Sequence, residues 1–337
     1  MKKLLIVLSV LFLLTGCGKK EIYGEVLSVT NEGQYVQLVV RTDNDRQVRI
    51  LADGHTHVYS FAEPDNCKGL LSGDLIRPVI SVSRMHRQNG AWLAEMICVE
   101  SVELPEGYTL KDGTRLTVRK DYANTIYIAP DGTELLREQD PIGPDNVHAG
   151  GVPSLSELKP EAQQAILSYY EGTGLFYDLD AELEQAYQWY LETEDGEPFD
   201  FCMVSQHIDP TAANDRFVWY SAYVTHPIRD GLHEETSVHT IFDRKTGAVI
   251  DPADLFTCSE TEAANRILDA AQMPDTELRR EMEKAFRFEY LNFNSDALEV
   301  CFPAGSLLNE HLDHYLGIDY GNLTGILHTW AIPDSIA

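Results

Sequence analysis

The spacing of apolar residues changes from period two to helical spacing near residue 153, and this change constrains the fold more than any other feature. Before residue 104, Val36, Leu38 and Val40 alternate with polar Gln37 and Arg41, as a half-buried strand requires. After residue 153, apolar residues recur three and four positions apart. A chain of 337 residues is also too long for one hydrophobic core, so we predict several domains.

Residues 22–104 form the first predicted domain, an all-β small barrel. Turn signals such as Asn31-Glu32-Gly33 and Ser72-Gly73-Asp74 separate its strands. The predicted strands are Tyr23–Val29, Tyr35–Arg41, Gln47–Leu51, Thr56–Phe61, Asp74–Val82 and Trp92–Val102. Their number and length resemble a barrel of the OB type. OB barrels often bind oligonucleotides or sugars, but this one lacks a basic aromatic face, so we expect it to act as a spacer or adaptor.

Residues 105–153 are predicted to form a β-hairpin linker region. Asp112-Gly113 and Asp131-Gly132 are each typical of a tight hairpin turn. A segment rich in Gly and Pro, Asp140–Pro153, then marks a domain boundary.

Helices mixed with strands fill the rest of the chain, which we divide into an α+β subdomain at 154–235 and a further α+β domain at 236–337. Long helices mixed with strands, without strict βαβ alternation, indicate an α+β fold. The predicted helices are Pro160–Glu171, Asp180–Thr193, a helix that ends at Ala271 and opens at the capping box Ser259-x-x-Glu262, and Thr276–Tyr290. The predicted strands are Phe199–Ile208, Phe217–Thr225, Ser237–Asp243, Ala297–Phe302 and Leu323–His328.

The first residues indicate export and lipidation. Lys2 and Lys3 precede an apolar run, Leu4–Leu14, which has the length of a signal peptide and is too short to span a bilayer. Leu14-Thr15-Gly16-Cys17 resembles the bacterial lipobox, whose cysteine accepts the lipid. We therefore expect a signal peptide at 1–16, lipid attached to Cys17, a tether at 17–21, and a place on the outer face of the bacterial cytoplasmic membrane.

Acidic residues are concentrated in the later part of the chain. Residues 18–104 carry 12 Asp+Glu and 9 Lys+Arg, whereas residues 105–337 carry 42 and 15. Such a surface repels nucleic acid and attracts cations and basic proteins, so we expect no nucleic-acid partner. The acidic residues are densest between positions 192 and 200, and we predict that this segment attracts a cationic partner. Its acidic residues are Glu192, Glu194, Asp195, Glu197 and Asp200. Acidity that serves solubility alone is the alternative.

Metal, disulfide and catalytic motifs are weak or absent. His311-x-x-His314 places two imidazoles on one face if the segment is helical, but a zinc site needs further ligands. His55-x-His57 beside a turn is equally short of ligands. The five cysteines after Cys17 are odd in number and form no C-x-x-C pair, so a disulfide framework is not indicated. With no G-x-S-x-G and no phosphate-binding loop, we predict no metal, cofactor or catalytic residue.

The segment from His239 to Phe256 resembles the RsiV-like extracytoplasmic domain. Phe242-Asp243-Arg244-Lys245-Thr246-Gly247 followed by Asp254-Leu255-Phe256 is similar to the F-D-x-K-T-G and D-L-F elements of that family, and Phe288–Pro303 is similar to its helix-to-strand segment. Residues 154–235 resemble the smaller domain that precedes it there and in PdaC-type polysaccharide deacetylases. The resemblance implies an envelope-binding module, which in the RsiV anti-sigma factor recognises lysozyme, a basic protein, and in PdaC-type enzymes accompanies a separate catalytic domain. The deacetylase metal motif is absent from this chain.

Charge and resemblance together predict a surface-anchored lipoprotein that binds or senses a cationic protein, such as a lysozyme-like protein, or a cell-envelope component, without catalysis. The alternative is an enzyme that acts on peptidoglycan or another glycan through an acidic pair that no motif marks. Two close carboxylates with a raised pKa would favour that alternative.

Overall fold

The computed structural model describes residues 21–60, 65–88, 90–139, 152–194, 196–308 and 311–334. The chain folds as two compact units: unit 1 comprises residues 1–139 and 183–202, and unit 2 comprises residues 140–182 and 203–337. This division differs from the predicted domains, because residues 183–202 lie with unit 1 and the two predicted α+β domains share unit 2. The predicted signal peptide and Cys17 lie outside the described residues.

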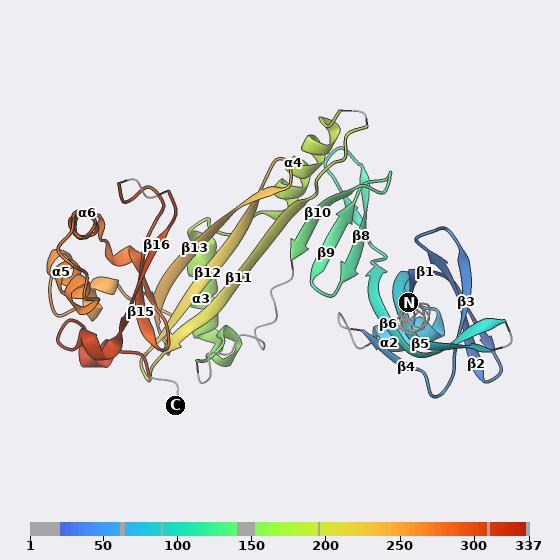
Figure 1. Cartoon of the computed structure of the whole chain (residues 1–337), viewed down its shortest axis with the longest axis horizontal. Helices are drawn as coiled ribbons and strands as arrows, with labels where there is room; N and C mark the ends of the chain where they lie inside the picture. Colours follow the sequence, from blue (N-terminus) through green and yellow to red (C-terminus); the bar gives the residue numbers. More distant parts are fainter. Residues whose placement is uncertain are drawn as a thin grey trace, which may run out of the picture. The chain divides into compact units, whose positions relative to one another are not determined.

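Five strands of unit 1 close into a barrel (Figure 1). They are β1 (Ile22–Glu32), β2 (Tyr35–Thr42), β3 (Gln47–Ala52), β5 (Ile76–Gln88) and β6 (Ala91–Glu103). Neighbours pair antiparallel around the ring except β3 and β6, which are parallel and close it. The short strand β4 (His57–Ser60) pairs with β6, and helix α2 (Asn66–Ser72), which we did not predict, lies between β4 and β5 in the chain.

The alternation in β2 fills the barrel interior, as predicted. Leu38 and Val40 are fully buried, and they pack with Ile50, Ile80 and Ile97 from three other strands. Arg41, one step out of phase, is exposed. Because the side-chain period of a strand is two, this phase fixes which face of each strand points inward.

A small antiparallel meander continues the sheet from β6. It contains β7 (Tyr108–Thr109), β8 (Arg115–Asp121), β9 (Asn124–Ile128) and β10 (Glu134–Gln139). Its hairpins turn at Asp112-Gly113 and Asp131-Gly132, which confirms the two predicted turns. Residues 101–103 of β6 pair with residues 119–121 of β8, so this region is part of a folded unit.

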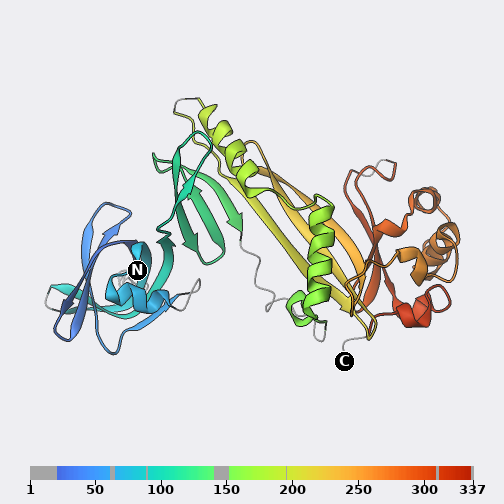
Figure 2. The ribbon, with the colours of Figure 1, turned by 180° about the vertical axis from the view of Figure 1, so that it is seen from behind.

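Unit 2 is built on three long antiparallel strands, β11 (Cys202–Ala213), β12 (Phe217–Ile228) and β13 (Leu232–Asp243). Helix α3 (Pro160–Gly172) covers one face of this sheet (Figure 2). Its buried side chains Ala162, Ile166 and Tyr170 pack against Tyr220 of β12 and Phe242 of β13.

The other face of β12 holds a second core. Phe217 and Trp219 are buried against a lobe made of α5 (Glu260–Ala270), α6 (Glu277–Ala285) and the sheet of β14 (Leu291–Phe293), β15 (Ala297–Phe302) and β16 (His314–Asp319). The Trp219 indole stacks on Phe293 with ring centroids 5.5 Å apart. Phe217, Trp219 and Tyr220 of β12 are therefore core residues, and together they face two layers.

The N-cap at Ser259 is confirmed, because the Ser259 hydroxyl accepts from the Glu262 amide at the start of α5. The Glu262 carboxylate lies 3.7 Å from the Arg266 guanidinium, so the second bond of the predicted capping box is not seen. The predicted helix 276–290 is too long: α6 ends at Ala285, and Phe286 leaves helical geometry. Phe286 and Phe288 both pack into the core, and Phe288 stacks on Phe256 at 4.5 Å. A straight helix would carry side chains two positions apart to different faces.

The final predicted strand, Leu323–His328, is wrong. This segment begins with the end of a 3₁₀ turn and bends at Gly325, whose φ is +76°. Leu323, Ile326 and Leu327 are buried, and a buried apolar run of this length is typical of a core strand as well as of a packed turn. The last strand is instead β16, which contains His314. His311 and His314 therefore do not share a helix face, and the condition for the His311-x-x-His314 pair is not met.

No helix within the described ranges has both the length and the apolar content needed to cross a bilayer.

Gly247 tests the packing of unit 2. Its φ is +70°, and an added Cβ would lie 2.5 Å from the carbonyl oxygen of Ala162 in α3. Gly305 has a similar φ of +79° and open space around it. Both Gly→Ala substitutions cost about 1–2 kcal/mol for the left-handed backbone, and Gly247→Ala adds about 1–3 kcal/mol of overpacking. We expect Gly247→Ala to lower the free energy of unfolding in urea well beyond Gly305→Ala. Equal losses would contradict the described approach of this turn to α3.

Candidate functional site

The predicted acidic patch lies in the loop between α4 (Leu179–Leu191) and β11. Glu192, Glu194, Glu197 and Asp200 are all exposed, and Asp195 lies outside the described residues. We call residues 192–200 the acidic loop. The structure therefore brings four of the five predicted side chains to the solvent on one short segment.

Aromatic residues at both ends of the acidic loop contact residues of the meander in unit 1. At the first end, the Tyr190 hydroxyl donates to Oδ2 of Asp131 at 2.8 Å, and the ring of Phe199 packs edge-on against Tyr190 at 5.8 Å. At the second end, the Arg137 guanidinium lies over the ring of Phe201 at 4.0 Å. The loop is thus displayed from a fixed base.

Helix α4 adds to the negative potential of the acidic loop. The C-terminus of a helix carries a partial negative charge, which cations in the last turn normally offset. The last turn of α4 contains no basic residue, and Glu192 and Glu194 follow directly. Like charges here repel one another, so binding a cation at the loop relieves an existing electrostatic cost.

The pKa of Asp131 is lowered, mainly by the hydrogen bond from the Thr133 amide and next by the one from Tyr190. Asp131 is therefore ionised at neutral pH, and the hydrogen bond from Tyr190 to Asp131 is charge-assisted.

Unit 2 carries a polar row across its sheet that superficially suggests catalysis. Asp209, Ser221 and His239 are direct neighbours on β11, β12 and β13. The Ser221 hydroxyl lies 2.5 Å from Nδ1 of His239, but Ser221 is fully buried, and burial lowers the pKa of His239. Beside it, His207 lies 3.4 Å from Asp209 and stacks on Tyr223 at 5.0 Å.

This row does not have the arrangement of a hydrolase triad. Such a triad places the histidine between an accessible nucleophile and a carboxylate, whereas here the buried serine is in the middle. The pKa values of Glu25, Asp131 and Asp243 are also lowered, the reverse of what a general acid needs. For Glu25, hydrogen bonds from Arg77 and Arg41 outweigh the opposing effect of burial.

Metal-binding chemistry has no support in the part of the chain that the structure describes, where no three His, Cys, Asp or Glu side chains cluster as ligands. His57, from the predicted His55-x-His57 pair, stacks on Tyr59 at 5.8 Å. Cys67, Cys98, Cys202, Cys258 and Cys301 are all free thiols in the structure.

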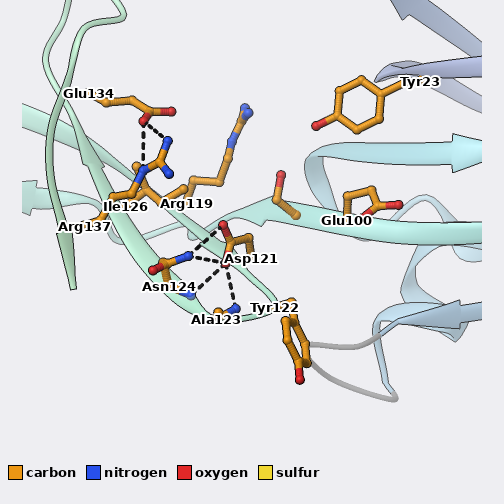
Figure 3. Close-up of a pocket in the computed structure, with 11 residues that line it drawn as sticks. Tyr23, Glu100, Arg119, Asp121, Tyr122, Ala123, Asn124, Ile126, Glu134 and Arg137 are labelled. Atoms are coloured by element: carbon orange, nitrogen blue, oxygen red, sulfur yellow. Dashed lines mark hydrogen bonds and ion pairs between the residues drawn. The ribbon is translucent and has the colours of Figure 1, made fainter. Parts of the chain in front are cut away.

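A pocket on unit 1 was not predicted from the sequence. It has a volume of about 410 Å³ and lies between the barrel and the meander. Tyr23 from β1, Glu100 from β6, Arg119 and Asp121 from β8, and Arg137 from β10 are among its lining residues (Figure 3). Alternation in β8 places Arg119 away from buried Leu116 and Val118, but only the pairing of β6 with β8 creates the hollow. No local sequence signal reveals that pairing.

Comparisons with known proteins give little guidance. No protein-family model and no curated protein match the chain. Solved structures with some similarity include a DUF3298 family protein from Pseudomonas aeruginosa PAO1. The two sequences are 17% identical, the TM-score is 0.26, and the match covers 44% of this chain and 71% of that chain. A member of the DUF3298 family from Bacteroides fragilis NCTC 9343 is 9% identical with a TM-score of 0.37, and the match covers 68% of this chain and 93% of that chain. At these TM-scores the similarities support no conclusion about fold or function.

The anchoring of the acidic loop predicts a pH-dependent effect of Tyr190→Phe. We expect this substitution to lower the free energy of unfolding by about 0.5 kcal/mol at pH 7, a small value because the pair is exposed. The carboxylate must be ionised to accept this bond strongly. The effect is therefore complete above the ordinary Asp131 pKa of 3.8 and disappears as pH falls through the lower folded value.

Urea unfolding of the wild-type and Tyr190→Phe chains from pH 7 to pH 3 measures this effect. In an Asp131→Asn background, Tyr190→Phe should show no such pH dependence. A Tyr190→Phe effect that is constant from pH 7 to pH 3 in the wild-type background would show that Asp131 is not its partner.

Proposed function

We propose that the protein is a non-enzymatic lipoprotein, anchored through Cys17 on the outer face of the cytoplasmic membrane, that binds or senses a cationic protein or cell-envelope component. A lysozyme-like protein is the first candidate partner. The proposal needs no cofactor or metal.

The observation that carries the proposal is the amount and placement of negative charge. Unit 2 carries 30 Asp+Glu against 10 Lys+Arg, and unit 1 carries 24 against 16. No Asp or Glu among the described residues is buried, so the described carboxylates are all at least partly exposed to solvent. A surface of this kind attracts a cationic protein over roughly one Debye length, about 8 Å at physiological salt.

The RsiV-like assignment is part of this proposal, and the residues that carry the resemblance have clear structural roles. Phe242 is buried under α3, and Asp243 Oδ1 accepts from the amides of Lys245 and Thr246 to form the turn. Gly247 has the positive φ that this turn needs, and Leu255 is buried in the second core. The motif therefore specifies a turn and its packing, which supports a shared fold and leaves the ligand to the charged surface.

The OB-like assignment of the barrel also belongs to the proposal. Its support is the closed ring of β1, β2, β3, β6 and β5. In chain order, α2 lies between β3 and β5, the third and fourth strands of that ring. In this reading the barrel serves as a spacer between the lipid and the acidic surfaces.

The acidic loop gives the proposal a direct test. We expect the full chain to bind hen lysozyme, used as a basic probe, in calorimetry at low salt. The double substitution Glu194→Gln/Glu197→Gln should raise the dissociation constant about 3- to 10-fold, because two attractive charges are removed without loss of volume.

Asp43→Asn/Asp45→Asn, an equal neutralisation of exposed residues on the barrel, is the matched control and should change the constant less than 2-fold. Equal effects of the two pairs would show that only net charge matters and would remove the loop from the proposal. The absence of any binding at low salt would contradict the proposal for lysozyme-like partners.

A further inference from the structure

The pocket on unit 1 contains one cationic side chain without a partner. The Nε atom of Arg119 is buried and makes no hydrogen bond, and the structure shows no ion pair to its guanidinium among the described residues. A guanidinium presents five N–H donors in a fixed planar fork, so an unpaired one inside a pocket is a strong site for a carboxylate.

The other charges of this pocket are already engaged. Oε2 of Glu134 accepts from Nε and Nη2 of Arg137, at 3.1 and 2.5 Å. Oδ1 of Asp121 accepts from the Ala123 and Asn124 amides, at 2.8 and 2.7 Å, and Glu100 accepts from the Ser81 hydroxyl. These bonds hold the carboxylates in place, and Arg119 remains as the donor in this pocket whose Nε makes no hydrogen bond.

Strand register places Glu103 of β6 directly opposite Arg119, but the Glu103 carboxylate accepts from the Arg77 guanidinium at 3.2 Å. Arg119, Ile126 and Arg137 form one row across β8, β9 and β10, because Ile126 pairs with both arginines. Glu134 lies on the same strand as Arg137 and neutralises it. Ile126 separates the two arginines and is itself buried, so Arg119 gains no carboxylate from that side.

Tyr23 supplies a second donor. In Figure 3 its hydroxyl points toward the Arg119 guanidinium across the open space of the pocket. Burial and the nearby charge of Glu100 raise the pKa of Tyr23, so the phenol keeps its proton and can donate. Tyr23 and Arg119 also border a second pocket of about 360 Å³, which contains Glu25 and Arg41.

The signs of the lining charges select the ligand. Glu100, Asp121 and Glu134 outnumber Arg119 and Arg137, so an anion alone meets a net negative pocket. A cation alone leaves Arg119 unpaired. A molecule that carries both signs satisfies the arginine and the surrounding carboxylates together. The volume suits a small ligand, because pockets that bind small molecules measure about 300–1,000 Å³.

We propose that the Arg119 pocket binds a small zwitterion, an amino acid or short peptide, whose carboxylate accepts from Arg119 and Tyr23 while its ammonium lies among the pocket carboxylates. This site adjoins the base of the acidic loop through Arg137, but it does not depend on the proposed function.

Titration calorimetry of the full chain tests the proposal with four probes: alanine, glycylglycine, acetate and methylammonium. We expect saturable binding of alanine or glycylglycine that is at least 10-fold tighter than that of acetate and methylammonium. No binding by any probe overturns the proposal. Acetate binding as tightly as the zwitterions would show that the ammonium plays no part and would equally overturn it.

Two variants locate the site. Arg119→Gln should raise the dissociation constant of the zwitterion about 10- to 100-fold, the effect of losing a charge-assisted hydrogen bond, and Tyr23→Phe should raise it about 2- to 10-fold. Tyr23→Phe removes one oxygen and keeps the ring, so it remains informative if Arg119→Gln unfolds the unit. Arg115→Gln, on an exposed residue of the same strand, is the matched control and should leave binding unchanged. Binding unaffected by both Arg119→Gln and Tyr23→Phe would place the ligand elsewhere.

Discussion

Burial on both faces of β12 is the constraint on which unit 2 depends. Tyr220 points to α3 and Trp219 points to the C-terminal lobe, and both are almost completely buried. One strand therefore belongs to two hydrophobic cores, and its alternation sets the register of β11 and β13 as well. Because apolar side chains fill both faces near this end of the sheet, the described carboxylates of unit 2 are confined to half-buried or exposed positions.

That confinement links the fold to the proposed function. A chain with 54 acidic residues and no described Asp or Glu in its interior must present strong negative charge to solvent. The few carboxylates with clear structural roles, such as Asp131 and Asp243, form turns and pins at the bases of loops. The acidic loop shows the pattern: an aromatic anchor at each end, and exposed carboxylates between them.

Local patterns allowed correct prediction of the elements they control. The strands of the barrel, the turn at Asp131-Gly132 and the Ser259 cap each depend on residues close in sequence. Predictions failed where distant packing decides. Helix α6 ends early because Phe286 and Phe288 both pack into the core. The predicted start of β13 is five residues too late, because the first residues of the strand, from Leu232, are exposed and show no alternation.

The candidate sites divide in the same way. Composition located the acidic loop, but its anchoring by Tyr190 depends on Asp131, 59 residues away. The Arg119 pocket depends on the pairing of β6 with β8 and on Tyr23 from β1, and no short motif encodes these contacts.

Sedimentation velocity of the full chain mixed with hen lysozyme, compared at 50 mM and 500 mM NaCl, tests the central claim most directly. Screening shortens the reach of charge from about 14 Å to about 4 Å between these conditions. The account predicts a complex at low salt that dissociates at high salt. Two independently sedimenting species at 50 mM NaCl would contradict it.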